Sequence, residues 1–405
     1  MSAASLADAP WFTAAPLRRV LGVLDGAGEE TRVVGGAVRN ALLGRPVSEV
    51  DLATTAVPEE TMRRARAAGL KAVPTGLAHG TVTVVADGTP FEVTTLREDI
   101  ETDGRHAVVR FGRDWRADAA RRDFTMNALY ADAQGRVIDL VGGLGDLRAG
   151  RVRFIGDAQT RIREDHLRIM RLFRFHAAYG RGPMDEAALS AAIRLRAGIL
   201  LLSRERVGSE LLKLLVVQGA APTVRLMGET GFLPTILGGV PDLISFERLA
   251  SLDVALDLTP EAVRRLGVLA VRIVEDAARL RERLRLSNEA FKRLQGMAGA
   301  TGAAMDARQA RASIYRLGRA MFEDRLLVGA ARGGRGNDEV AALLDLARVW
   351  TVPAPPFRAA DLIAQGLKPG PALGAALARM EDAWIAADFA TDAQSLHALM
   401  ALARP

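Results

Sequence analysis

The sequence contains no cysteine among its 405 residues. Disulfide bonds, thiolate-bound metal sites and a cysteine nucleophile are therefore excluded. A chain without cysteine suits a reducing compartment, and we expect a cytoplasmic protein. Residues 1–16 do not combine a basic segment with an apolar run, so no signal peptide is expected. No apolar run is long enough to cross a bilayer, so we expect no membrane partner.

Lysine is scarce. The chain has 54 basic and 48 acidic residues, a net charge of +6, and nearly all of its positive charge is arginine. The only lysines are Lys71, Lys213, Lys292 and Lys368. A mild basic excess is compatible with a nucleic-acid partner, but a composition rich in arginine and alanine also follows from genome composition. The five histidines show no spacing typical of metal ligands.

The remaining composition is that of a globular protein, long enough for about two to four domains. Strand and helix patterns alternate in the first 150 residues. Two strands, residues 81–85 and 91–96, are joined by Asp87-Gly88, which is typical of a hairpin. From Tyr179 onward the periodicity is almost wholly helical. We therefore predict an α+β fold, in which a small mixed or mostly antiparallel sheet is followed by helical domains.

The stretch Val33-Val34-Gly35-Gly36-Ala37-Val38-Arg39-Asn40 predicts a buried strand, a tight turn and a short helix that ends before Gly44. The first amides of a helix have no internal partner and its dipole favours negative charge, so this turn is a candidate anion site. Arg39, in the first turn, could add a bidentate grip on phosphate. Two glycines before a helix are, however, often no more than a turn.

Glu49 and Asp51 follow, two residues apart, with Val50 and Leu52 between and after them. In a strand the two carboxylates would share one face and repel each other unless a cation lay between them. Mg²⁺ is the usual cation beside a phosphate site, and Glu92, in a later strand, is a candidate third carboxylate. Solvated acids on an edge strand are the simpler alternative. A dinucleotide-binding oxidoreductase is disfavoured because no G-x-G-x-x-G follows the first strand.

Three further segments have the following predicted structures. Residues 97–114 are polar and charged and predict a mobile loop. Residues 121–129 predict a helix that packs Phe124 and places Arg122, Asp123 and Asn127 near another face. Residues 151–154 predict a strand.

A long helix is predicted from about residue 157 to residue 179. It would carry Asp165, Arg168, Arg171 and Arg174 in one row. A carboxylate can accept from the amino group of cytosine or adenine while a guanidinium donates to the ring acceptors, whereas uracil and guanine present the wrong donors. An Asp165/Arg168 pair on a rigid helix could thus select C and A without a template. A ladder of surface ion pairs is the alternative.

Together these motifs resemble the class II CCA-adding enzymes (tRNA nucleotidyltransferases) and the related bacterial poly(A) polymerases. The resemblance is close over residues 30–237 and rests on Gly35-Gly36-Ala37-Val38-Arg39, the acids at 49 and 51, and the stretches 91–97, 121–128, 164–168 and 203–213. It implies a nucleotidyltransferase head of the polymerase-β type (residues 1–150), a neck that binds RNA and nucleotide (151–237), a helical body (238–350) and a helical tail (351–405).

The resemblance also implies an activity, namely addition of C, C and A to the tRNA 3′ end from CTP and ATP by two-metal transfer, with release of pyrophosphate. Mg²⁺ would be held by Glu49 and Asp51, with Glu92 as the third catalytic carboxylate. The nucleotide-binding residues would fall into three groups. These are Gly35, Gly36 and Arg39 for the triphosphate, Arg122 and Asn127 beside the nucleotide, and Asp165 and Arg168 for the base, supported by Arg171 and Arg174.

Two residues depart from the family pattern. Glu49 stands where aspartate is usual, so its carboxylate is displaced by one methylene, and Asn40 replaces a frequent aspartate. The alternatives are a poly(A) polymerase, an enzyme that adds only CC or only A, and a catalytically silent RNA-binding protein. The oligomeric state is left open.

Overall fold

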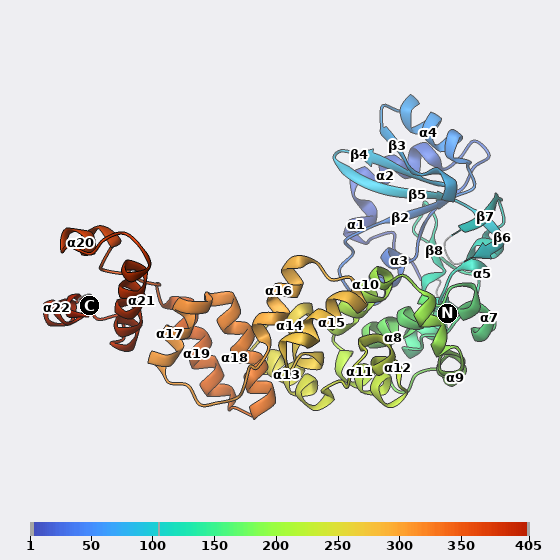
Figure 1. The fold of residues 1–405 in the computed structure, drawn as a ribbon. Coiled ribbons are helices and arrows are strands. Elements are labelled where there is room, and N and C mark those ends of the chain that lie inside the picture. The colour runs from blue at the N-terminus through green and yellow to red at the C-terminus, as the bar shows by residue number, and fades with distance from the viewer. Residues whose placement is uncertain (1–3, 104–105, 403–405) are drawn as a thin grey trace. The chain divides into compact units, whose positions relative to one another are not determined.

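The computed structural model describes residues 4–103 and 106–402. These residues divide into two compact units, the first ending at Ile236 and the second beginning at Leu237 (Figure 1). The first unit holds the sheet and the helices up to the neck segment, and the second is helical. The finer division into head, neck, body and tail stays a prediction.

The first unit is built on a seven-stranded mixed sheet with the order β3-β4-β5-β2-β1-β8-β9. Its strands are β1 (Thr31–Val34), β2 (Asp51–Thr54), β3 (Lys71–Gly76), β4 (Thr81–Ala86), β5 (Thr89–Thr95), β8 (Leu129–Ala131) and β9 (Val137–Asp139). Neighbouring strands are antiparallel except β2 and β5, which run parallel. The predicted mixed sheet is confirmed, and so is the β4–β5 hairpin, where Asp87 and Gly88 take positive φ angles of 49° and 79°.

Four helices accompany the sheet: α1 (Pro10–Thr13), α2 (Ala15–Leu24), α3 (Gly36–Leu42) and α4 (Pro58–Ala67). Helices α2 and α4 contact each other and strand β4 (Figure 1), and Val82 and Val84 of that strand are fully buried. Helix α3 follows β1 directly, as predicted, because Gly35 takes a positive φ of 72° that turns the chain sharply out of the strand.

Residues 97–114 do not form the predicted loop. They form an antiparallel hairpin of β6 (Arg97–Asp103) and β7 (His106–Phe111), followed by α5 (Trp115–Arg121). The tip residues 104–105 lie outside the described residues. The β-branched residues Val108 and Val109 favour a strand. The charged and polar residues around them led to the prediction of a loop.

Residues 121–129 do not form one helix either. Helix α5 ends at Arg121, a 3₁₀ turn η2 spans Thr125–Asn127, and β8 begins at Leu129. Pairing of β8 with β1, which is distant in sequence, and with the adjacent strand β9 buries Tyr130 completely and overrides the local helical pattern. The strand predicted at residues 151–154 is only an isolated bridge between Phe154 and Phe124.

Helices complete the first unit. They are α6 (Gly143–Ala149), α7 (Ala158–Glu164), α8 (Leu167–Tyr179), α9 (Glu186–Arg194), the 3₁₀ segment η3 (Arg196–Leu201), α10 (Arg204–Leu215), α11 (Ala220–Glu229) and α12 (Phe232–Leu237). The long helix predicted for residues 157–179 is broken, because Asp165 is extended (φ −154°, ψ 106°) and its Oδ1 accepts from the amide of Leu167 at 3.0 Å. A local side-chain bond of this kind competes with helix continuation.

The second unit is all-α, as predicted. Its helices are α13 (Leu243–Ala255), α14 (Ala262–Ala270), α15 (Val274–Leu284), α16 (Asn288–Met297), α17 (Ala307–Leu317), α18 (Arg319–Gly333), α19 (Asn337–Val349), α20 (Ala359–Ala364), α21 (Pro371–Ala386) and α22 (Ala393–Ala401). Buried Asp324 pairs with Arg264 and Arg293, and Trp384 is buried in the core of the last helices. None of the helices within residues 4–103 and 106–402 is long and apolar enough to cross a membrane.

Candidate active site

A pocket of about 490 Å³ in the first unit gathers residues from four separate segments of the chain. It is lined by Gly35, Gly36, Arg39, Asp51, Arg122, Asp123, Asn127, Asp165, Arg168, Arg171, Arg174 and Phe175. All nine residues that the sequence assigned to nucleotide binding are among them, together with one of the three carboxylates. The other two, Glu49 and Glu92, are not part of the lining.

The three carboxylates lie near the start of β2. Asp51 begins β2 and is directly opposite Glu92 of β5 in the parallel register. Glu92 is exposed between buried Phe91 and Val93, as its predicted alternation requires. Glu49 is exposed and precedes the strand, so the prediction that it shares a strand face with Asp51 is wrong. The reason is that the β1 partner of Asp51 is Val34, after which the chain leaves the sheet.

The charges of these three side chains interact. Burial, and then the negative charges of Glu92 and Glu49, raise the pKa of Asp51 above its ordinary value. Within the described part of the chain, no three histidine or acidic side chains lie close enough to form a metal-binding group by themselves. Asp51 and Glu92, opposite each other on neighbouring strands, offer oxygen donors crowded with negative charge, which fits a hard divalent cation whose remaining ligands come from a bound phosphate.

Arg39 is held firmly beside the glycine turn. It is 7% exposed, and its Nη1 donates to Asn127 Oδ1 at 2.5 Å while its Nη2 donates to the Tyr179 hydroxyl at 2.8 Å. Its guanidinium also lies 4.2 Å from the centre of the Tyr179 ring. Burial lowers the pKa of Arg39, though a guanidinium remains charged at neutral pH. No sequence signal indicated that Tyr179, at the far end of α8, supports this arginine.

The buried carboxylate of Asp118 orients Arg122. Its Nε and Nη2 donate to Asp118 Oδ2 at 3.1 and 2.9 Å, and its Nε is 3.2 Å from the Tyr130 hydroxyl. Burial alone would lower the pKa of Arg122, but the charge of Asp118 raises it. The side chain is thus a fixed cation at the pocket wall.

Asp123 is a pocket residue that the sequence analysis did not select. Its Oδ1 accepts from Asn127 Nδ2 at 2.9 Å, and its Oδ2 accepts from Arg171 Nε and Nη2 at 2.8 and 2.5 Å. Burial by itself raises the pKa of Asp123, but Arg171 and Asn127 hold it below its ordinary value. Its position between Arg122 and Asn127 was the available signal in the sequence. The helix predicted for residues 121–129 led to its being left out of the candidate site.

Asp165 and Arg168 both reach the pocket but do not pair with each other. Arg206 of α10 donates to Asp165 Oδ2 at 2.6 Å. Arg168 Nη1 donates to Glu164 Oε2 at 2.5 Å and to the carbonyl of Arg161 at 2.8 Å. Each side chain is therefore oriented by its own partner, and each oxygen of Asp165 can accept a further hydrogen bond.

Three guanidinium groups surround the ring of Phe175. Those of Arg39, Arg171 and Arg174 lie 5.3, 5.2 and 4.6 Å from its centre. Arg174 is held by Glu210 of α10, with Nε 2.6 Å from Oε2. A buried phenylalanine at helical spacing resembles any core residue, so no sequence signal distinguished Phe175. The lining carries five arginines against three acids, which suits a ligand with several negative charges.

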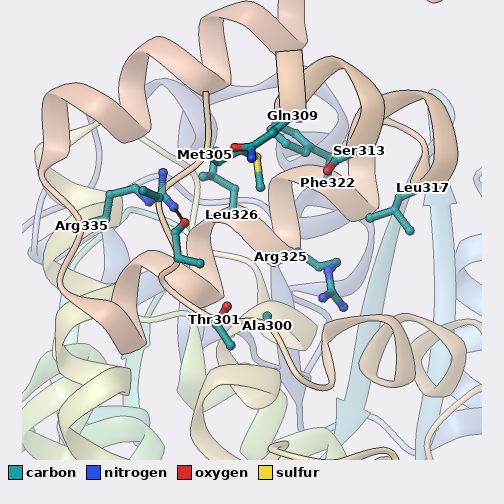
Figure 2. Close-up of a pocket in the computed structure, with 12 residues that line it drawn as sticks. Ala300, Thr301, Met305, Gln309, Ser313, Leu317, Phe322, Arg325, Leu326 and Arg335 are labelled. Atoms are coloured by element: carbon teal, nitrogen blue, oxygen red, sulfur yellow. Dashed lines mark hydrogen bonds between the residues drawn. The ribbon is translucent and has the colours of Figure 1, made fainter. Parts of the chain in front are cut away.

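A smaller pocket of about 260 Å³ lies in the second unit beside α17 and α18 (Figure 2). Its lining is largely apolar and contains no carboxylate. The guanidinium of Arg325 is occupied by the carbonyls of Gly296 and Ala298, and that of Arg335 by the carbonyl of Ala303 and by Glu339. This pocket offers neither metal ligands nor an open anion site, whereas the pocket around Arg39 and Asp165 gathers the predicted residues and is the candidate active site.

Comparisons with known proteins agree with this geometry. Residues 31–153 match the family model described as the poly A polymerase head domain. A CCA-adding enzyme of Limosilactobacillus fermentum is 30% identical over 394 residues, which cover 94% of this chain and 95% of that protein. The chain belongs to the CCA-adding enzyme family.

Other members of the family are more similar over a shorter stretch. Human CCA tRNA nucleotidyltransferase 1, mitochondrial, is 38% identical over 267 residues, or 64% of this chain. The match spans about 60% of the length of that protein and of its mouse counterpart. Among solved structures, the Bacillus stearothermophilus CCA-adding enzyme in complex with CTP has a TM-score of 0.74 and 28% identity, covering 96% of this chain and 98% of that one. The predicted fold class, a nucleotidyltransferase head followed by helical domains, is confirmed.

Proposed function

We propose that the protein is a CCA tRNA nucleotidyltransferase, which adds C, C and A to the 3′ end of tRNA from CTP and ATP and releases pyrophosphate. One observation carries the proposal: a single pocket brings Asp51 from the start of β2 and Arg39 from α3 together with Asp165 and Arg168 from the α7–α8 junction. A metal-binding carboxylate, phosphate-binding cations and a base-reading pair are the parts that such a transfer needs. The near full-length match to a CCA-adding enzyme supports it.

The triphosphate would lie against the arginines. Arg39, Arg171 and Arg174 converge on the ring of Phe175, and Asn127 and Asp123 fix the orientation of the first two. Fixed cations stabilise the charge that develops on a leaving pyrophosphate without reorganising during the reaction. Gly36 adjoins this cluster, since a Cβ there would lie in ordinary van der Waals contact with Arg39 Nη2, at 3.7 Å.

Enzymes of this family generally use a divalent metal ion, and we propose Mg²⁺. Asp51 and Glu49 would hold it, with Glu92 as the third carboxylate, because the mutual repulsion that raises the pKa of Asp51 is relieved by a cation. Mg²⁺ in such a site lowers the pKa of an attacking hydroxyl and stabilises negative charge on phosphate. Asp51 must be ionised to serve as a ligand, so its raised pKa opposes metal binding at low pH.

The base would be read by Asp165 and Arg168. The carboxylate accepts from the exocyclic amino group that cytosine and adenine share, and the guanidinium donates to a ring acceptor. Arg206 and Glu164 hold these two side chains separately, so neither neutralises the other in the absence of nucleotide. This pattern would admit C and A and reject U and G with protein groups alone.

A poly(A) polymerase is the second candidate, favoured by the description of the matching head-domain model. Such an enzyme would add A repeatedly to RNA with the same metal and phosphate groups. An enzyme restricted to CC or to A would share them too. A cytoplasmic location stays a prediction of the sequence.

The decisive experiment is incorporation by the purified protein into a tRNA that lacks its last three nucleotides. CTP and ATP are supplied separately and together, with and without Mg²⁺, and the products are separated at single-nucleotide resolution. Addition of CCA that then stops supports the proposal. Unlimited addition of A identifies a poly(A) polymerase, partial addition identifies a restricted enzyme, and no incorporation with any divalent ion contradicts transfer altogether.

A further inference from the structure

The ring of His166 occupies the space that a side chain at residue 198 would need. Gly198, in η3, is buried, and a Cβ there would lie 1.7 Å from His166 Cδ2 and 2.2 Å from Nε2. This is the tightest such contact of any glycine in the part of the chain that the structure describes. Real Cβ atoms do not approach other atoms so closely, so the packing of η3 on His166 depends on glycine at this position.

His166 stands at the junction that presents the base-reading residues. It lies between Asp165, the extended residue after α7, and Leu167, which begins α8, and its carbonyl accepts from the amide of Ile169 at 3.1 Å. It is the N-cap residue of α8, but its side chain makes no capping hydrogen bond. The imidazole therefore acts here by packing, and what it packs against is Gly198.

We propose that His166 and Gly198 are a positioning pair for nucleobase selection. The ring, wedged into the space beside Gly198, fixes the break between α7 and α8 and hence the direction of the Asp165 carboxylate and the Arg168 guanidinium. Base discrimination by hydrogen bonds depends on such geometry, because a displaced acceptor no longer distinguishes an amino group from a carbonyl. This inference rests on the proposed function, since it concerns how the same pocket chooses its nucleotide.

The test compares Gly198→Ala, His166→Ala and the double variant. In Gly198→Ala the methyl group displaces the ring, and we expect the preference for CTP and ATP over UTP and GTP to fall on the order of tenfold to a hundredfold. In His166→Ala we expect a smaller loss of this nucleotide preference, because the α7–α8 junction loses the packing of the ring but no new methyl group displaces it. In the double variant the new methyl group occupies part of the space that the ring left, so selectivity should recover above that of Gly198→Ala.

Selectivity is measured in two ways: as kcat/KM for each of the four nucleotides in tRNA extension, and as the binding of labelled nucleotides in equilibrium dialysis without tRNA. Gly22→Ala, in α2, is the matched control, because nothing lies within 4 Å of a Cβ there. Thermal melting of every variant separates selectivity from loss of fold. If wild-type protein binds CTP and ATP selectively but extends no tRNA, the result contradicts the proposed function alone. The role of His166 and Gly198 is then tested by the nucleotide-binding selectivity of the variants. Unchanged selectivity in Gly198→Ala, or a double variant no better than Gly198→Ala, would overturn the positioning pair.

Discussion

Asp51 carries a charge that the folded protein holds at a cost. Burial and the neighbouring acids Glu92 and Glu49 raise its pKa, so ionisation at neutral pH opposes folding slightly. We predict that Asp51→Asn lowers nucleotide incorporation at least on the order of a hundredfold and leaves the melting temperature equal or higher. Single-turnover incorporation and thermal melting at pH 7 check this. Glu59→Gln, an exposed acid of α4, is the control, and an active Asp51→Asn protein would contradict the metal assignment.

The same residue predicts a pH dependence of stability. A carboxyl whose folded pKa is raised binds protons more strongly in the folded state. The stability of wild-type protein should therefore fall, relative to Asp51→Asn, as pH rises from about 4 through the raised pKa. Denaturant unfolding of both proteins between pH 3 and pH 8 measures the difference. Parallel curves over the whole range would show that Asp51 titrates alike in both states.

The pKa of Asp123 is shifted in the opposite direction to that of Asp51. Burial raises its pKa, but Arg171 and Asn127 overcome this and hold the folded pKa low, so its charge stabilises the fold above about pH 4, and this contribution is lost as pH falls through the folded pKa. We predict that Asp123→Asn costs about 2 kcal/mol of unfolding free energy at pH 7, because it leaves the Arg171 guanidinium without its ion pair. The difference between the variant and wild type should shrink as the pH falls below about 4 towards the folded pKa. Urea unfolding at pH 7 and at a series of acidic pH values checks this, and equal stability at pH 7 would contradict the assigned pair.

At the scale of elements, the turn η2 that carries Asn127 rests on the first residue of α6. A Cβ at Gly143 would lie 2.2 Å from the carbonyl oxygen of Thr125, and a backbone atom cannot move aside as a side chain can. Gly143→Ala should therefore destabilise the protein by about 1–3 kcal/mol and displace Asn127, lowering incorporation.

Gly145, two residues on in the same helix, is the matched control. Nothing lies within 4 Å of a Cβ there. Gly145→Ala should be neutral or stabilise the protein by about 0.5–1 kcal/mol, since alanine is favoured over glycine inside a helix. Thermal melts and incorporation assays of the two variants are compared side by side, and equal behaviour would mean that η2 does not depend on this approach.

The helices and strands also show which parts of the fold could be predicted from the sequence. The β1–α3 turn was predictable because Val34, Gly35 and the residues after them interact locally. The strand β8 was not, because the pairing of Tyr130 with Val34 of β1 depends on residues far away in sequence. The break at Asp165 follows from one side-chain bond to the amide of Leu167, which periodicity cannot register.

The site residues divide in the same way. Charged residues in recognisable motifs were found, and the structure places Arg39, Arg122 and Arg168 in one pocket. The groups that orient them were missed, because Tyr179 and Arg206 are brought close only by tertiary packing. Asp123 was named in the motif of residues 121–129, but it was placed on a predicted helix that the structure does not contain.

At the scale of the whole molecule, the lining of the pocket and the partners that orient it all belong to the first unit. The lining spans residues 35–175, and the supporting Arg206 and Glu210 lie in α10. The second unit has a core of its own around Trp384 and buried ion pairs around Asp324. The groups proposed to bind the nucleotide are therefore separate from the second unit.

This separation gives the last prediction. A fragment of residues 1–239, which keeps α12 whole, should fold cooperatively and bind CTP and ATP within about threefold of the full chain, because every lining residue and its partner are retained. Its extension of tRNA should fall on the order of a hundredfold or more if the helical second unit supplies contacts to the RNA. Equilibrium dialysis, circular dichroism melts and extension assays measure the three properties. A folded fragment that fails to bind nucleotide would show that the second unit completes the pocket, and one that extends tRNA like the full chain would place the RNA contacts in the first unit.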